Sequence, residues 1–145
     1  MPKLKIRLEE GWITLFLLLA LILTAAVTIN QAELTPGTVV LPIVGGTAVI
    51  VGLLLAKSKF SANTAHCMAL IYGFFMIGYL VGTTLPEALT WHERILDLAS
   101  RQTDWFVKAF TGGTSRDGLI FVLQTAAVFW LLGYTAAWYT FRKPR

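Results

Sequence analysis

The neighbouring residues His66 and Cys67 are the first place in this sequence to look for chemistry. A thiol beside an imidazole can act as a nucleophile with its general base. The pair lies within a long apolar stretch, however, and adjacent positions of a helix point about 100° apart. The two side chains would therefore leave the helix in different directions. We expect Cys67, the single cysteine, to be a buried and unreactive thiol.

The other patterns that carry chemistry are incomplete. His66 and His92 fall on opposite sides of the predicted membrane, so they cannot ligate one haem iron. No cluster of histidine, cysteine and carboxylate occurs at metal-ligand spacing. Gly45 and Gly46 lack the Lys and Ser or Thr of a phosphate-binding loop. We expect a protein that is not an enzyme, with no cofactor, no metal and no small-molecule substrate.

The apolar stretches themselves predict the architecture. Of the 145 residues, 56% are hydrophobic and 14% are charged, whereas globular proteins have about 25% charged residues. A stretch of about 20 apolar residues crosses a hydrocarbon core of about 30 Å. The sequence therefore predicts one all-α membrane domain with four transmembrane helices, at residues 12–30, 37–56, 65–82 and 118–141.

These spans hold no ionisable side chain away from their ends. Pumps and transporters usually carry such groups within their spans, so this class is disfavoured. The polar residues Asn30, His66 and Gln124 are interpreted as structural, either reaching the interface or bonding between helices.

The distribution of Lys and Arg predicts the orientation, because cytoplasmic loops are enriched in them. With the amino terminus inside, eight of the twelve basic residues are cytoplasmic. We therefore expect a multi-pass membrane protein with both termini in the cytoplasm. The net charge of +4 does not indicate nucleic acid, because the basic residues form small groups beside the spans.

The long connector between the third and fourth spans predicts an amphipathic helix at about residues 85–111, outside the cytoplasm. Its capping box is either Thr84 with Glu87 or Thr90 with Glu93. Gln102 is the one polar break on its apolar face. The helix would lie in the membrane interface or pack against a partner protein, and both remain open. The apolar face comprises Trp91, Ile95, Leu98, Trp105 and Ala109.

Small residues spaced four apart within the spans indicate helix contact faces, since close backbone approach drives helix association in lipid. These faces would pack within the chain or against another protein. The predicted helix-packing residues are Ala48, Gly52, Ala56, Gly78, Gly82, Gly133 and Ala137. Aromatic residues near the span ends match interfacial belts, and these are Trp12, Trp91, Trp105, Trp138 and Tyr139.

Several segments resemble the amino-terminal membrane region of bacterial transglutaminase-like membrane proteins, especially those of Chloroflexota. These segments are residues 10–14, 54–58, 89–94, 112–115 and 131–138. In that family the catalytic Cys, His and Asp lie in a downstream extracytoplasmic domain. Nothing here matches that domain, and Cys67 cannot be carried over as its nucleophile. The resemblance therefore implies a membrane region of the bacterial inner membrane, without transglutaminase activity.

Three functions follow as hypotheses. The first is a non-catalytic subunit that packs against and stabilises a larger membrane complex, with lipid and other integral membrane subunits as its partners. The resemblance points to bacteria that are rich in photosynthetic and respiratory assemblies. This suggests that the complex is an electron-transfer complex. The second is a membrane anchor for a transglutaminase-like enzyme. A small transporter or channel is the third and is disfavoured by the uncharged spans.

Overall fold

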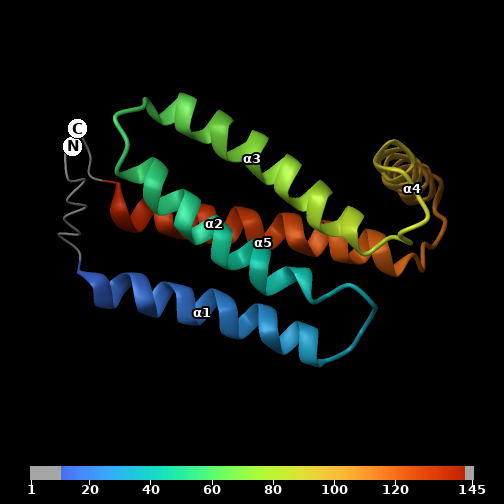
Figure 1. Cartoon of the computed structure of the whole chain (residues 1–145), viewed down its shortest axis with the longest axis horizontal. Coiled ribbons are helices and arrows are strands. Elements are labelled where there is room, and N and C mark those ends of the chain that lie inside the picture. The colour runs from blue at the N-terminus through green and yellow to red at the C-terminus, as the bar shows by residue number, and fades with distance from the viewer. Residues whose placement is uncertain (1–10, 143–145) are drawn as a thin grey trace.

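Five α-helices make up the part of the chain that the computed structural model describes, residues 11–142, and no strand occurs there. Three of them, α1, α3 and α5, are long and apolar enough to cross a membrane, while α2 is a shorter apolar helix. The helices are α1 (Trp12–Gln31), α2 (Val40–Ala56), α3 (Ala62–Thr83), α4 (Trp91–Thr111) and α5 (Gly118–Phe141), as Figure 1 shows.

The helix ends differ from the predicted ranges where local capping decides them. α2 begins at Val40 rather than at residue 37, because Gly37 adopts a φ of 93° within a turn. α3 begins earlier than predicted because the Ser61 hydroxyl accepts a hydrogen bond from the backbone N–H of Thr64 at 3.2 Å. α4 begins at Trp91 rather than at residue 85. Thr90 and Glu93 form its capping box, which decides between the two predicted boxes.

The core of the bundle is the contact between α2 and α5, which run in the same direction from the α4-bearing end, with α1 and α3 on either side (Figure 1). Ten of the seventeen residues of α2 are buried, compared with three of the twenty in α1. The outer faces of α1 and α3 are apolar and exposed, with Phe16, Leu17, Phe74 and Phe75 among their residues. Apolar outer faces are typical of helices that face lipid rather than water.

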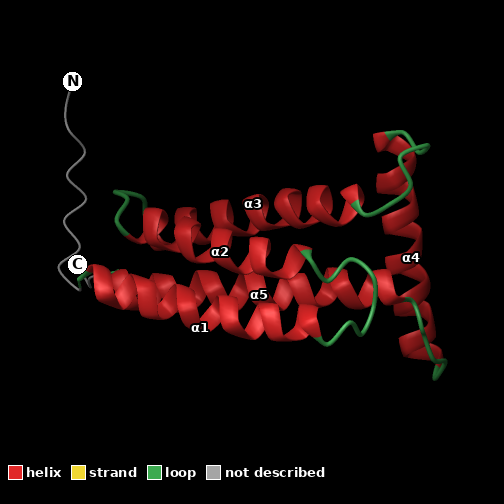
Figure 2. Ribbon diagram, turned by 60° about the horizontal axis from the view of Figure 1, so that its bottom comes forward, coloured by secondary structure: helices red, strands yellow, loops and turns green. Residues whose placement is uncertain are grey.

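The helix α4 lies across one end of the bundle, crosswise to the other four helices (Figure 2). Its one buried residue is Leu98. Asp117 caps α5 by accepting a hydrogen bond from the Leu119 backbone N–H at 3.0 Å. We call this end, which carries α4 and the α1–α2 loop, the α4 end. The opposite end, which carries the α2–α3 loop and the last turn of α5, is the loop end.

Candidate functional site

The seam between α2 and α5 uses most of the predicted small residues. A Cβ placed on Gly52 would lie 2.7 Å from the Cβ of Ala137 and 2.8 Å from the Tyr134 carbonyl oxygen. A Cβ placed on Gly133 would lie 2.9 Å from the Cβ of Ala48. Larger residues would hold the two backbones apart. Ala56 is buried at the end of α2. These small residues pack within the chain.

A second close approach joins α3 to α5 and was missed in the sequence. The buried indole of Trp130 donates a hydrogen bond from Nε1 to the Ala69 carbonyl oxygen at 3.0 Å. The indole lies directly over Gly73, where a Cβ would overlap with it. Ala69 and Gly73 are spaced four apart, so the small-residue pattern could have identified them. The residues predicted to pack on this helix are Gly78 and Gly82 instead.

The two glycines that were predicted for α3 have different surroundings. Gly82 is buried, and a Cβ there would lie 2.9 Å from the Trp91 ring of α4. A Cβ on Gly78 would meet no atom within 4 Å. Gly82 therefore accommodates α4, while Gly78 faces open space beside the exposed Phe74 and Phe75.

His66, the candidate general base, forms a hydrogen bond between α3 and α5. His66 Nδ1 lies 2.7 Å from the hydroxyl oxygen of Tyr134 on α5. Its ring also lies 4.8 Å from that of Trp138, measured between centroids. The pair Tyr134 and Trp138 thus places the imidazole against α5, as expected for a structural polar group.

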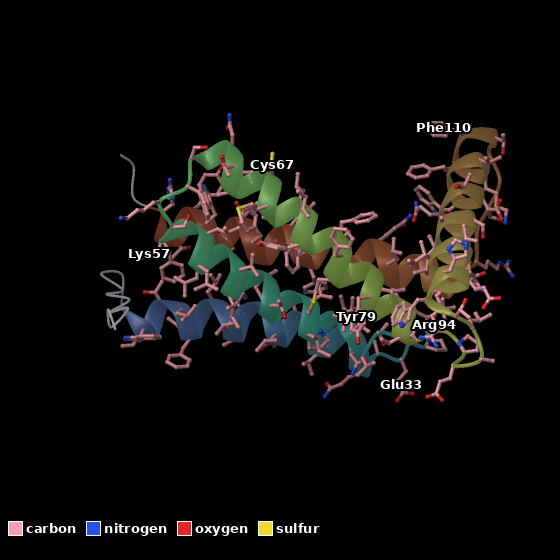
Figure 3. The ribbon with its side chains drawn as sticks, turned by 45° about the horizontal axis from the view of Figure 1, so that its top comes forward. Glu33, Lys57, Cys67, Tyr79, Arg94 and Phe110 are labelled. Atoms are coloured by element: carbon pink, nitrogen blue, oxygen red, sulfur yellow. The ribbon has the colours of Figure 1, made fainter. Side chains whose placement is uncertain are left out.

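The prediction that Cys67 is a buried thiol is wrong. Cys67 is exposed on α3, and its side chain points away from the bundle (Figure 3). The apolar run around it does not distinguish a face toward lipid from a face toward the core, because both are hydrophobic. With His66 directed at α5, the two residues do not form a nucleophile and base.

Arg142 closes the loop end. Its guanidinium donates hydrogen bonds to the backbone carbonyl oxygens of Ala56 and Ser58, both at 3.2 Å, and of Phe60 at 2.8 Å. The same group lies over the Trp138 ring, 4.7 Å from its centroid. The carbonyls at the end of α2 have no partner within their own helix, and a cation there also complements the helix dipole. One side chain therefore ties α5 to the α2–α3 loop.

Arg94 has a similar arrangement at the α4 end. Its guanidinium donates hydrogen bonds to the carbonyl oxygens of Gly82 and Pro86, both at 3.2 Å, and of Leu89 at 3.1 Å. It lies 5.0 Å from the Trp91 ring centroid. Trp91 in turn stacks on Tyr79 of α3, with centroids 5.1 Å apart and planes within 13°. Figure 3 shows Tyr79 and Arg94 at this corner of the molecule.

Ionic contacts hold the middle of α4. Arg101 donates to Asp97 at 2.8 Å within the helix and to Asp117 at 3.0 Å, at the start of α5. The hydrogen bond that Arg101 donates to the Asp97 carboxylate is the main cause of the raised pKa of the Arg101 guanidinium. The hydrogen bonds that Glu93 accepts from the Thr90 backbone and hydroxyl lower the pKa of the Glu93 carboxyl. Both pairs are partly or fully exposed, so their role is orientation rather than large stabilisation.

The remaining polar candidates do not gather into a reaction site. Asn30 accepts a hydrogen bond from the Thr38 hydroxyl at 3.0 Å and braces the α1–α2 turn. His92 lies on α4, at the other end of α3 from His66. Among residues 11–142, no three His, Cys, Asp or Glu residues are grouped to hold a metal. An open hollow beside Asn30 and Glu33 has only one carboxylate in its lining.

The residues predicted to form interfacial aromatic belts differ in their exposure. Trp12, Trp91 and Tyr139 are exposed, and Trp105 is half-buried. Trp138 is 5% exposed and packs beneath Arg142. It therefore belongs to the interior of the bundle rather than to an exposed belt.

Comparison of the chain with protein-family models, curated proteins and solved structures finds no significant match. The resemblance to transglutaminase-like membrane regions accordingly stays a prediction from the sequence.

Proposed function

We propose that this chain is a non-catalytic membrane subunit that crosses the bilayer four times and packs against a larger membrane complex through the outer face of α3. This face comprises Cys67, Ile71, Phe74, Phe75 and Gly78. The observation that carries the proposal is the open position of Gly78 within it.

The four crossings are supported by chain direction. α1 ends at the α4 end, and α3 begins at the loop end (Figure 1). If α1 and α3 both cross the membrane, the chain must return between them, and α2 is the segment that does so. Its 17 residues span about 26 Å at 1.5 Å per residue, a few Å less than a typical hydrocarbon core. Burial between α1, α3 and α5 shields its ends.

The orientation is supported by the charges at the two ends. The described residues of the loop end include Lys57, Lys59 and Arg142 but no Asp or Glu. The α4 end has four basic residues together with all of the described acidic residues. We therefore propose that the loop end is cytoplasmic and that α4 lies on the opposite side.

The outer face of α3 is suited to a partner helix. Positions 67, 71, 74 and 78 recur at steps of four and three, so their side chains share one side of the helix. Phe74 is 77% exposed and Phe75 is 68% exposed. A glycine between large side chains leaves a notch that allows another backbone to approach closely, and such contact favours association in lipid. Gly82 is already occupied by Trp91, so Gly78 is the position available to a partner.

Gly78→Leu tests this proposal. We expect it to leave the fold intact, because a side chain there meets no atom of the chain, and to reduce co-purification of a partner at least about tenfold. Ala20→Leu, at an exposed alanine of α1, is the matched control and should keep the partner. The measurement is stoichiometry in mild detergent with identification of each band. A wild-type chain that purifies as a lone monomer, or a Gly78→Leu variant with an unchanged partner, would contradict the proposal.

A further inference from the structure

We infer that α4 lies on lipid through one side of its second half, with the stripe Ile95, Ala99, Phe106 and Phe110, which begins in the first half, inserted into the membrane surface at the α4 end. This inference concerns the chain alone and does not depend on a protein partner.

The first half of α4 holds the helix to the bundle. Trp91 packs on Tyr79 and covers Gly82, and Leu98 is buried. Arg101 bonds to Asp117 at the start of α5. Beyond Arg101, the described residues show no hydrogen bond or stacked ring that joins α4 to another helix. The second half therefore extends from an anchored first half.

The extending half is strongly apolar on one side. Phe110 is 87% exposed, and Phe106 is also exposed. With Ile95 and Ala99 they recur at steps of four and seven, which places all four on one stripe beside the surface that rests on the bundle. Asp97, Asp104 and Lys108 occupy the opposite side of the helix.

The direction of α4 points to lipid as the occupant. When the bundle stands upright in a bilayer, α4 lies parallel to the membrane plane because it crosses the bundle axis (Figure 2). Phe110 projects from the side of α4 that faces back along the bundle (Figure 3). The stripe thus faces the same lipid layer that surrounds the exposed apolar faces of α1 and α3. Interfacial helices bury their apolar face at this depth.

The charges of α4 specify the kind of lipid contact. The segment Trp91–Thr111 contains three basic residues, Arg94, Arg101 and Lys108, and three acidic residues, Glu93, Asp97 and Asp104. Arg94 and Arg101 are already bonded to carbonyls and carboxylates. A segment with no net formal charge gains little from anionic headgroups. We therefore assign the contact to apolar insertion that does not depend on lipid charge.

The test places a nitroxide at position 106, 110, 104 or 108 in a Cys67→Ala chain reconstituted alone in phosphatidylcholine vesicles. At positions 106 and 110, we expect the ratio of collision rates with oxygen to those with a water-soluble nickel chelate to be about tenfold higher than at 104 and 108. Adding phosphatidylglycerol to one third of the lipid should leave this ratio unchanged.

Each alternative gives a different result. High nickel accessibility at 106 and 110 would place the stripe in water and overturn the inference. Low accessibility to both reagents would show protein contact, from a second copy or from the bundle, and would also overturn it. A ratio that rises severalfold with phosphatidylglycerol would contradict the charge-independent contact. Because Gly78 is unchanged and no partner is present, these outcomes are separate from those of the subunit test.

Discussion

The two ends of the bundle share one arrangement of arginine and tryptophan, but the arginines bond to carbonyls at different distances along the chain. At each end an arginine lies over a tryptophan and donates hydrogen bonds to three or more backbone carbonyls at helix ends and in loops. Arg142 reaches carbonyls 82 to 87 positions away in the chain, whereas Arg94 reaches carbonyls only 5 to 12 positions away. Arg142 therefore holds distant parts of the fold together. Arg94 stabilises the local α3–α4 connection and orients α4.

Burial of the two tryptophans follows the same difference. Trp138 is 5% exposed and packs against His66 of α3, while Trp91 is 45% exposed and stacks on the outer ring of Tyr79. A buried contact between distant segments is lost only when the bundle opens. A local and exposed contact can be lost while the spans stay packed. The comparison predicts global effects from substitutions at the loop end and local effects at the α4 end.

Arg142→Ala should have the largest effect on stability. The substitution leaves the carbonyls of Ala56, Ser58 and Phe60 without this donor and uncovers Trp138. Hydrogen bonds to a charged group contribute about 1.5–3 kcal/mol, so we expect a loss of about 3 kcal/mol. Thermal unfolding in detergent, followed by tryptophan fluorescence, measures it.

Two controls make this prediction specific. Arg142→Lys keeps the charge but loses the planar fork, so it should recover only part of the stability. Lys59→Ala removes another exposed cation from the same loop and should change stability little. An Arg142→Ala chain as stable as Lys59→Ala would show that the carbonyl contacts are not what closes this end.

Arg94→Met should have a smaller and local effect. The spans should unfold at nearly the wild-type temperature, because the lost bonds reach only Gly82, Pro86 and Leu89. The first half of α4 should become more mobile, since its link to the preceding loop is gone. Hydrogen exchange of backbone amides is the measurement, with an increase of about tenfold expected in Trp91–Ser100. An equal loss of stability from Arg94→Met and Arg142→Ala would remove the distinction between the two ends.

Much of the helical layout could be predicted from the sequence, because long apolar runs and a regular amphipathic pattern both reflect local physics. α5 spans the predicted range, and α4 ends at Thr111 as predicted. Helix starts were less accurate. The start of α4 depended on a choice between two capping boxes with equivalent sequence patterns, and the structure forms the box of Thr90 and Glu93.

What could not be predicted was which side of each apolar helix faces the bundle. In a membrane span, lipid-facing and buried residues have similar hydrophobicity, so hydropathy does not orient the helix. Cys67 was therefore placed inside and Trp138 in the belt, whereas the structure has Cys67 exposed and Trp138 buried. Arg142 was considered only as a topology signal, since its carbonyl partners lie more than 80 positions away in the chain.

The smallest predicted effect is the acid response of the α4 cap, and it sharpens the contrast between the ends. The Glu93 carboxylate accepts hydrogen bonds from the Thr90 backbone N–H at 2.7 Å and hydroxyl at 2.8 Å, and these lower its pKa. A lowered pKa in the folded state means that the cap stabilises α4 fully above the ordinary glutamate pKa. This contribution is lost as the pH falls through the lowered value.

Hydrogen exchange in the first turn of α4, corrected for its intrinsic pH dependence, should therefore rise only on strong acidification. Glu93→Gln keeps a hydrogen-bonding amide at the same position but cannot titrate, so its corrected exchange should stay flat. Glu87→Gln changes an exposed acid in the loop before α4, outside the cap, and should behave as the wild type. The described residues of the loop end contain no Asp or Glu, so exchange at Arg142 should not follow this acid transition. A Glu93→Gln chain with the same acid response as the wild type would show that another group governs the start of α4.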